Sequence, residues 1–416
     1  MEEKKRILVL TADAGFGHRS AANAFAAAME LKHGAECEIK IVNPLDDRRA
    51  PFYLRDSGAD YDRILRLAPD LYKLGYEASD NEIPSMLMEN VLTLGLYEIM
   101  HDLIRAEKPD AIVSTYPLFQ APLSTYFKLN RTFVPLTLIV TDLATVHRIW
   151  FSPGVDMCMV PTMEVYDLAV SNGIAQNKIH ITGIPVSPAF SGRQPAKKEL
   201  RNQLGWDPKL PTVLAVGSRR VDQLLDNLNV LNHFGRPIQL VAVAGKDDEL
   251  FAQLQAVDWH VPAHIYNFVT NMPEFMQAAD AIICKAGGLV VTESLAAGLP
   301  MLLVDVIPGQ EEGNRDYVVK NGAADMIESP MEMLETMAHL MADGGALFKQ
   351  RARNARQLGK PNSALDVAEM VWRSALRGPV SKKRLFGQGR HILIDLLGRY
   401  NIPWRENQSV EHYGHE

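Results

Sequence analysis

Short apolar runs rich in β-branched residues alternate with helix-length segments along most of this sequence. In the N-terminal part, Ser20–Lys32 has the length of a helix, and another helix is expected to end at Glu107. Strands that alternate with helices pair in parallel and are covered by those helices. The pattern therefore predicts an α/β fold with a mostly parallel sheet. The strands expected here are Ile7–Ala12, Glu38–Val42, Ala111–Ser114, Leu136–Thr141, Asp156–Pro161 and Ile179–Thr182.

The alternation starts again at Thr212, after a stretch, Ile184–Ala196, that holds three prolines and one glycine without an apolar period. Such a stretch is typical of a linker. We therefore expect two Rossmann-like domains, 1–190 and 191–372, facing an interdomain cleft, with a helical insertion at about 52–106 and a basic helix and tail at 373–416. The second series comprises strands at Thr212–Val216, Gln239–Ala244, Ala263–Tyr266, Ala281–Cys284 and Met301–Val304, and helices at Val221–Asn232, Asp247–Gln255, Met272–Ala278 and Val290–Ala297.

Size, charge and cysteine content narrow the class of protein. A chain of 416 residues corresponds to two or three domains at about 150 residues each. The net charge of −7 excludes a globally basic nucleic-acid-binding protein. The three cysteines form no C-x-x-C pair, which disfavours a disulfide framework or a Cys-rich zinc site and favours a reducing, cytoplasmic location. No apolar run approaches the roughly 20 residues that span a bilayer.

A glycine-containing turn, Gly15-Phe16-Gly17-His18, follows the first expected strand and opens the first helix. Backbone N–H groups at such a helix start can bind an anion. NAD binding is disfavoured because the second strand ends at Asn43 rather than at an acidic residue. His18 lies where the helix terminus disfavours the imidazolium, so its neutral ring can accept a proton. The alternative is a histidine that only caps the helix.

A second polar segment, Thr141–Trp150, begins where an apolar strand ends. Open α/β sheets place their sites at the carboxyl ends of parallel strands. Asp142 is therefore a candidate general base. The alternative is an aspartate that caps a following helix.

A third candidate region runs from Cys284 through Gly287 and Gly288 to Glu293, in the order strand, glycine-rich turn, helix. The backbone N–H groups of this turn suit a diphosphate, and Glu293, one turn into the helix, suits a ribose diol. The polar cluster 308–314, which contains Gln310, Glu311 and Asn314, suits a sugar. Walker A, H-E-x-x-H and G-x-S-x-G motifs are missing. A D-x-D pattern at 60–62 follows no strand, so no metal is expected.

Taken together, these motifs resemble the family 28-type glycosyltransferases, in particular the monogalactosyldiacylglycerol synthase and processive diacylglycerol glucosyltransferase group. The resemblance covers about residues 5–372. It implies a GT-B fold with the acceptor in the N-terminal half and a UDP-sugar in the C-terminal half. The motifs that carry it are GFGHRSAANA (15–24), the segment 69–76, TDLATVHRIWF (141–151), ITGIPVSPAF (181–190), CKAGGLVVTESLAAGLPM (284–301) and PGQEEGN (308–314).

The resemblance implies inverting transfer without a metal or other cofactor, with His18 and Asp142 as the candidate base and its orienting or acceptor-contacting partner. Gly17, His147 and Trp150 are expected to contact the acceptor. Val216–Arg220 departs from the family, which has several glycines there; the two arginines either contact the diphosphate, change donor preference or accompany impaired transfer. The expected UDP-sugar-binding set is Gly217, Ser218, Arg219, Gly245, Phe268, Val269, Lys285, Ala286, Gly287, Gly288, Glu293, Gln310, Glu311 and Asn314.

The function predicted is therefore transfer of a hexose from UDP-glucose or UDP-galactose to a lipid such as diacylglycerol. Three alternatives stay open: transfer to a soluble or cell-wall acceptor, UDP-sugar binding without catalysis, and sugar-nucleotide 2-epimerisation. A lipid acceptor requires contact with a bilayer. Residues 373–405 carry eight basic residues and one acid, and 391–404 has apolar residues at mostly helical spacing. Such a segment suits peripheral binding to an anionic inner membrane face, although this helix could instead pack on the N-terminal domain; 86–104 is the other candidate.

Overall fold

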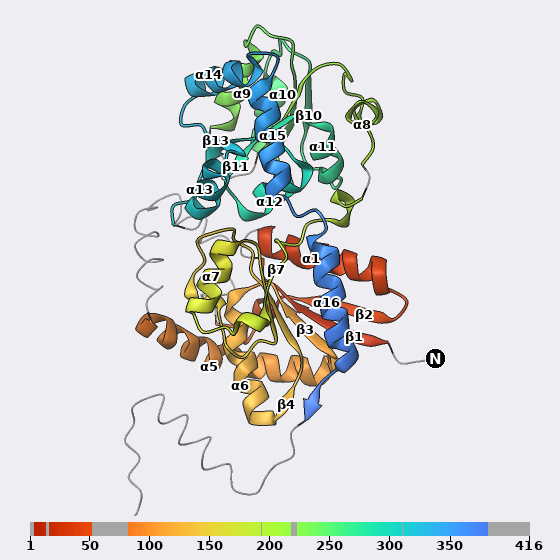
Figure 1. The fold of residues 1–416 in the computed structure, drawn as a ribbon, viewed down its shortest axis with the longest axis vertical. Coiled ribbons are helices and arrows are strands. Elements are labelled where there is room, and N and C mark those ends of the chain that lie inside the picture. Colours follow the sequence, from red (N-terminus) through yellow and green to blue (C-terminus); the bar gives the residue numbers. More distant parts are fainter. Residues whose placement is uncertain are drawn as a thin grey trace, which may run out of the picture.

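The computed structural model describes residues 4–13, 16–51, 82–192, 194–217, 223–309 and 311–381, with the side chains of Phe16 and of 82–92 left out. In these ranges the chain forms two α/β halves stacked along the long axis of the molecule (Figure 1). Each half contains a six-stranded sheet. The α/β fold with two Rossmann-like domains is confirmed.

The first sheet has the strand order β2-β1-β3-β5-β6-β7, and all its pairs are parallel. Alternate residues of β1 point to opposite faces. Leu8 and Leu10 pack with the core on one face, whereas Ile7 and Val9 pack with that on the other. The strands are β1 Lys5–Leu10, β2 Cys37–Val42, β3 Ala111–Ser114, β5 Leu136–Ile139, β6 Met157–Val160 and β7 Ile179–Ile181.

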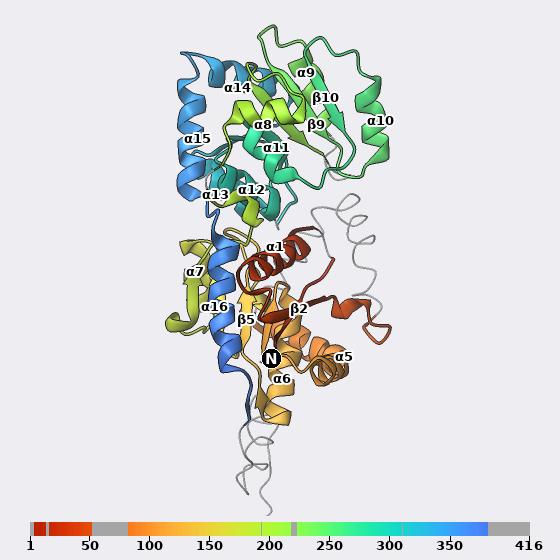
Figure 2. The same ribbon diagram turned by 90° about the vertical axis from the view of Figure 1, so that its right-hand side faces the viewer.

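Helices cover both faces of this sheet. The helices α5 and α6 pack together on the Leu8 and Leu10 face, while α1 and α16 pack together on the other (Figure 2). The helices of this half are α1 Phe16–His33, α5 Glu82–Glu107, α6 Gln120–Asn130 and α7 Met163–Ser171, with short 3₁₀ helices η1 Pro44–Asp46, η2 Pro117–Phe119, η3 Arg148–Trp150, η4 Gln176–Lys178 and η5 Pro188–Phe190. Of the predicted insertion at 52–106, residues 52–81 lie outside the described residues.

The second sheet has the order β10-β9-β8-β11-β12-β13 and is also parallel. Its strands are β8 Thr212–Val216, β9 Gln239–Val243, β10 Ala263–Tyr266, β11 Ala281–Lys285, β12 Met301–Asp305 and β13 Ala324–Met326. Its helices are α8 Lys197–Leu204, α9 Leu224–Asn232, α10 Asp248–Ala256, α11 Met272–Ala278, α12 Gly288–Ala297, α13 Glu312–Lys320, α14 Pro330–Met341 and α15 Ala346–Leu358.

The chain returns to the N-terminal half through α16, Ser363–Arg377, which packs against α1, β1 and β3 (Figure 1). Val367, Val371 and Ala375 are fully buried there. The helix leads into β14, Val380–Ser381, which pairs antiparallel with β4, Thr132–Phe133. The boundary predicted at 372/373 therefore falls inside a helix whose apolar face belongs to the core of the first sheet.

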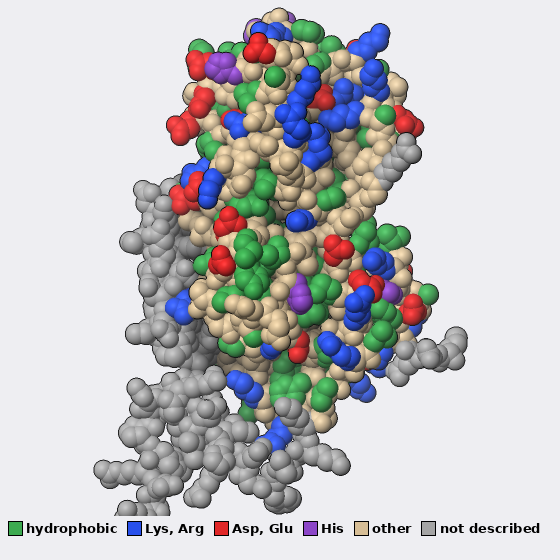
Figure 3. Space-filling model, viewed as in Figure 1, with side chains coloured by type: hydrophobic (Ala, Val, Ile, Leu, Met, Phe, Trp, Pro, Cys, Tyr) green, Lys and Arg blue, Asp and Glu red, His purple; other side chains and the backbone are tan. Residues whose placement is uncertain are grey.

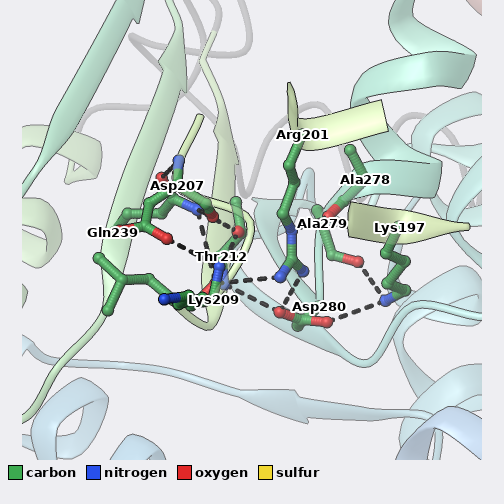
Figure 4. Close-up of polar contacts among 10 residues, drawn as sticks. Lys197, Arg201, Asp207, Lys209, Thr212, Gln239, Ala278, Ala279 and Asp280 are labelled. Carbon is green, nitrogen blue, oxygen red and sulfur yellow. Dashed lines mark hydrogen bonds and ion pairs between the residues drawn. The ribbon is translucent and has the colours of Figure 1, made fainter. Parts of the chain in front are cut away.

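Asp280 ties α8 to the sheet of the C-terminal half. Its carboxylate pairs with Lys197 at 3.0 Å and with Arg201 at 2.5 Å, and it accepts the N–H of Thr212 at 2.9 Å (Figure 4). These groups lie at the amino ends of β8 and β11. The network therefore anchors the end of the interdomain linker without occupying the carboxyl edge of the sheet.

Two properties of the molecule bear on its contact with a membrane or another partner. Among the described residues, no helix is both long and apolar enough to cross a bilayer. Lys and Arg side chains gather over α15 on the face shown in Figure 3. The predicted basic helix 391–404 lies outside the described residues.

Candidate active site

The candidate residues gather at the switch point of each sheet, where neighbouring strands lead to connections on opposite sides. In the first sheet β1 lies between β2 and β3, and in the second sheet β8 lies between β9 and β11. The turn that opens α1 follows β1, and the glycine turn that opens α12 follows β11. Open α/β sheets bind ligands at such points. Figure 2 shows α1 facing α12 across the two halves, and the two helices are in contact.

His18 is half-buried in the first turn of α1 and held on several sides. Its Nδ1 lies 2.9 Å from Oγ1 of Thr141, and its carbonyl oxygen accepts a hydrogen bond from the Thr115 hydroxyl at 3.0 Å. The ring meets Tyr116 edge-on at 4.9 Å and Trp150 at 5.8 Å between centroids. Burial lowers the pKa of His18 to about 4, against an opposing effect of the Thr115 backbone. The ring is therefore neutral near pH 7.

Asp142 comes from the connection after β5 and lies at the first turn of α12. A Cβ placed on Gly288 would be 2.6 Å from the carbonyl oxygen of Thr141 and 3.5 Å from Oδ1 of Asp142, so only glycine fits. Burial raises the pKa of Asp142 to about 7; the Asn314 amide opposes this shift, and the charge of Glu311 adds to it. A carboxyl group with this pKa can take up a proton near neutral pH.

The two halves are joined at this point by a second close contact. The N–H of Leu143 donates to Oδ1 of Asn314 at 2.8 Å. A Cβ on Gly313, in the first turn of α13, would lie 2.2 Å from Oγ1 and 2.6 Å from the backbone N of Thr145. The first turns of α12 and α13 therefore rest directly on the connection that carries Asp142. The oxygen of Asn314, predicted to bind the UDP-sugar, is already occupied by this contact.

A charged pair lies beside the glycine turn in the C-terminal half. Nζ of Lys285 is 2.5 Å from Oε1 of Glu311, and Oε2 of Glu311 accepts the N–H of Ile307 at 3.1 Å. A Cβ on Gly287 would approach this carboxylate to 3.2 Å. A cation next to free backbone N–H groups suits a diphosphate, and a buried carboxylate suits sugar hydroxyls.

Glu293 is half-buried in the second turn of α12, and burial raises its pKa to about 7. Within the described ranges its carboxyl group has no hydrogen-bond or ion-pair partner. This side chain is therefore available to a ligand.

We predict that Glu293→Ala weakens UDP binding by about 1–3 kcal/mol, the cost of leaving a buried polar partner unpaired. Isothermal titration calorimetry with UDP measures it. Glu335→Ala, which changes an exposed carboxylate on α14, is the matched control. Unchanged affinity in folded Glu293→Ala would remove Glu293 from the site.

The rest of the predicted donor set is distributed along the same edge. Gly217 follows β8 and packs too tightly against Leu250 for a side chain. Gly245 follows β9 with φ of +70°, a conformation that favours glycine. Phe268 is exposed beneath the ammonium of Lys246, at 4.4 Å, and Val269 is partly buried next to it. Ala286 is buried directly after β11, whereas Ser218, Arg219 and Gln310 lie outside the described residues.

The predicted acceptor contacts differ in exposure. Among the described residues, nothing lies within 4 Å of a Cβ placed on Gly17, so these residues leave this part of the turn open. Trp150 is only 4% exposed and packs in the core, with its ring near His18. His147 is 6% exposed, and its Nδ1 accepts the N–H of Ile149, which caps η3. The helix η3, which follows β5 in the chain, is therefore capped by His147 and not by Asp142.

The sequence analysis assigned no individual role to several residues that shape the site. Thr141 and Thr115 fix His18, and Thr145 and Gly313 bring the halves together. Thr115 directly follows β3, so the carboxyl-end rule applied to every strand would have found it. Within the residues that the structure describes, no group of three or more His, Cys, Asp or Glu side chains could hold a metal ion, and the D-x-D pattern at 60–62 is not among them.

Comparison with known proteins identifies the family. The family model of monogalactosyldiacylglycerol synthase matches residues 18–186, and that of the glycosyltransferase family 28 C-terminal domain matches 213–367. Monogalactosyldiacylglycerol synthase 2 of Arabidopsis thaliana is 31% identical over 393 residues, covering 91% of this chain and 83% of the relative. The chain belongs to the monogalactosyldiacylglycerol synthase family. The resemblance inferred from the motifs is thus confirmed.

Other relatives and folds agree with this assignment. The monogalactosyldiacylglycerol synthase of Spinacia oleracea is 31% identical, covering 88% of this chain and 72% of the relative. MurG of Acinetobacter baumannii superposes with a TM-score of 0.57 at 16% identity, covering 89% of this chain and 100% of that one. UDP-GlcNAc 2-epimerase of Neisseria meningitidis reaches a TM-score of 0.54 at 14% identity, covering 90% and 100%. These two structures support the GT-B fold alone.

Membership in the monogalactosyldiacylglycerol synthase family makes this protein a glycosyltransferase of glycolipid biosynthesis. The fold does not separate transferases from 2-epimerases, because structures of both superpose with similar TM-scores, 0.57 and 0.54. The sequence match over most of the chain does separate them, and it favours the transferase.

Proposed function

We propose that this protein transfers galactose from UDP-galactose to diacylglycerol with inversion at the anomeric carbon. Relatives that share most of its length are named monogalactosyldiacylglycerol synthases, which favours galactose over glucose. The observation that carries the proposal is the junction of the halves, where Asp142 lies against Gly288 at the first turn of α12. A proton acceptor from one half is thereby next to an anion-binding turn of the other.

The reaction needs two contributions from this chain, a base and a source of positive potential. A base takes the proton of the acceptor hydroxyl as its oxygen attacks the anomeric carbon. The bond to the diphosphate breaks, and its electron pair leaves with UDP. The first turn of α12 and the cation of Lys285 are expected to stabilise that charge. In this proposal these groups supply the positive potential, and no metal or other cofactor is required.

The test is to incubate the purified protein with UDP-galactose labelled in the sugar, with and without diacylglycerol. Labelled monogalactosyl lipid and UDP that form only with diacylglycerol would support the proposal. UDP-glucose in parallel measures donor choice. Transfer of the sugar to water-soluble or cell-wall acceptors with release of UDP, UDP binding without turnover, or an epimerised sugar nucleotide would each support one of the alternatives and contradict this function.

Peripheral binding to an anionic membrane surface is part of the same proposal. Lys382, Lys383 and Arg384 lie in the basic segment that follows β14, outside the described residues. We predict that binding to anionic phospholipid vesicles falls with rising salt and falls when these three residues become Ala.

Vesicle sedimentation at low and high salt measures this binding. A triple Ala variant of Lys198, Lys349 and Arg353, all exposed on the C-terminal half, removes the same charge and is the control. If both triple variants bind like the wild type, the basic segment is not the anchor.

A further inference from the structure

The hydrogen bond between His18 and Thr141 determines which ring nitrogen of His18 carries its hydrogen. A neutral imidazole has one donor and one acceptor nitrogen, and a threonine hydroxyl can act as either. The 2.9 Å contact from Nδ1 to Oγ1 therefore has two forms. In one, the Thr141 hydroxyl donates to Nδ1, and the ring hydrogen is on Nε2. In the other, Nδ1 donates to Oγ1, and Nε2 is free to accept a proton.

The surroundings of Thr141 distinguish the two forms. Thr141 is 6% exposed, and in the part of the chain that the structure describes its hydroxyl has no other hydrogen-bond partner than His18. If Nδ1 were the donor, the hydrogen of this buried hydroxyl would have no acceptor among those residues, which is unfavourable for a buried polar group. If the hydroxyl is the donor, that cost disappears.

We propose that Thr141 is a positioning residue that holds His18 in the tautomer with hydrogen on Nε2, which makes His18 a hydrogen-bond donor and leaves Asp142 as the base. This assignment rests on the proposed galactosyl transfer for its catalytic part. The proton of the acceptor hydroxyl goes to the carboxylate of Asp142 as the new carbon–oxygen bond forms. The bond from the anomeric carbon to the diphosphate breaks, and UDP leaves with the electron pair.

Thr141 is placed to couple both halves. Its side chain holds His18 of α1, and its carbonyl oxygen touches Gly288 of α12. Asp142 is the next residue in the chain. A change at the Thr141 hydroxyl is therefore expected to affect the orientation of His18 and of the base while leaving the nucleotide contacts of the C-terminal half in place.

The test that does not depend on activity is ¹⁵N NMR of the His18 ring in the full chain. The two nitrogens of a neutral imidazole differ strongly in chemical shift according to which carries hydrogen. We expect the Nε2–H tautomer in the wild type and in Thr141→Ser, and a mixture in Thr141→Val. His18→Ala identifies the resonances. The Nδ1–H tautomer in the wild type would overturn the proposal.

Kinetics supply the second readout. We expect Thr141→Val to lower kcat by about 10-fold with UDP affinity unchanged, and Thr141→Ser to restore it. Full activity in Thr141→Val would overturn the positioning role. If the NMR result holds but no variant, nor the wild type, forms galactolipid, the proposed function fails while the tautomer assignment stands. If galactolipid forms but the wild-type tautomer is Nδ1–H, the inference fails and the function stands.

Discussion

Replacing Asp142 by Asn is expected to lower turnover by about 10²- to 10⁴-fold, the range that a general base contributes, with UDP affinity unchanged. Asn is close in size to Asp and can keep the contacts to Gly288, but it cannot accept the proton. Rates of galactolipid formation and calorimetry with UDP measure the two quantities. Near-normal turnover in Asp142→Asn would mean that another group is the base.

The pH profile separates Asp142 from His18. A base must be deprotonated, and the pKa of Asp142 is raised to about 7, so kcat/KM should rise with pH up to about that value and then level off. His18→Ala is also expected to lower turnover by ~10²-fold, but to keep the rising limb. Loss of the limb in His18→Ala, and its survival in Asp142→Asn, would reverse the assignment.

Stability offers a check without any substrate. The folded-state pKa of Asp142, about 7, lies above the ordinary value of 3.8. The folded state therefore holds a proton that the unfolded state has lost, and stability declines as pH rises from about 4 to 7. Asp142→Asn does not lose stability in this way. The Tm of Asp142→Asn minus the Tm of the wild type should therefore increase between pH 4 and pH 8. Calorimetry measures both values.

Much of the fold was predictable because a parallel sheet buried on both faces leaves a strong sequence pattern. Ala111–Ser114, Thr212–Val216 and Ala263–Tyr266 match β3, β8 and β10 residue for residue. The other predicted strands differ from the observed ones by one or two residues at one or both ends, and Ser20–Lys32 is the inner part of α1. The strand β13, which is only three residues long, was not predicted from the sequence. The return of α16 to the first half depends on tertiary packing, which no local pattern reveals.

The candidate site was predictable where position along a strand decides it, and not where contacts between halves decide it. His18, Asp142, Gly288 and Glu311 follow strands or open helices, and the structure places them at the junction of the two sheets. The hydrogen bond from the N–H of Leu143 to Oδ1 of Asn314 joins residues that are 171 apart in sequence. Gly313 and Thr145, which also meet between the halves, are likewise far apart in sequence. Such pairs emerge only when the relative placement of the halves is known.

Replacing Gly313 by Ala is expected to lower turnover by about 10²-fold, the order of loss that a 1 Å misplacement of reacting groups causes. The added Cβ would lie 2.2 Å from Oγ1 and 2.6 Å from the backbone N of Thr145, so the halves must move apart. Within α13 itself, Ala favours the helix over Gly by about 1 kcal/mol. Any loss must therefore come from the contact between the halves, which displaces Asp142 from the first turn of α12.

Three measurements identify this mechanism. UDP affinity of Gly313→Ala should stay near that of the wild type, because the C-terminal half is intact, whereas small-angle scattering should show a wider particle. Lys320→Ala, an exposed change in the same helix, is the control. Adding Thr145→Ala to Gly313→Ala removes the contact to Oγ1 but not that to the backbone N, so we expect partial recovery. Wild-type turnover in Gly313→Ala would show that transfer does not require this approach of the two halves.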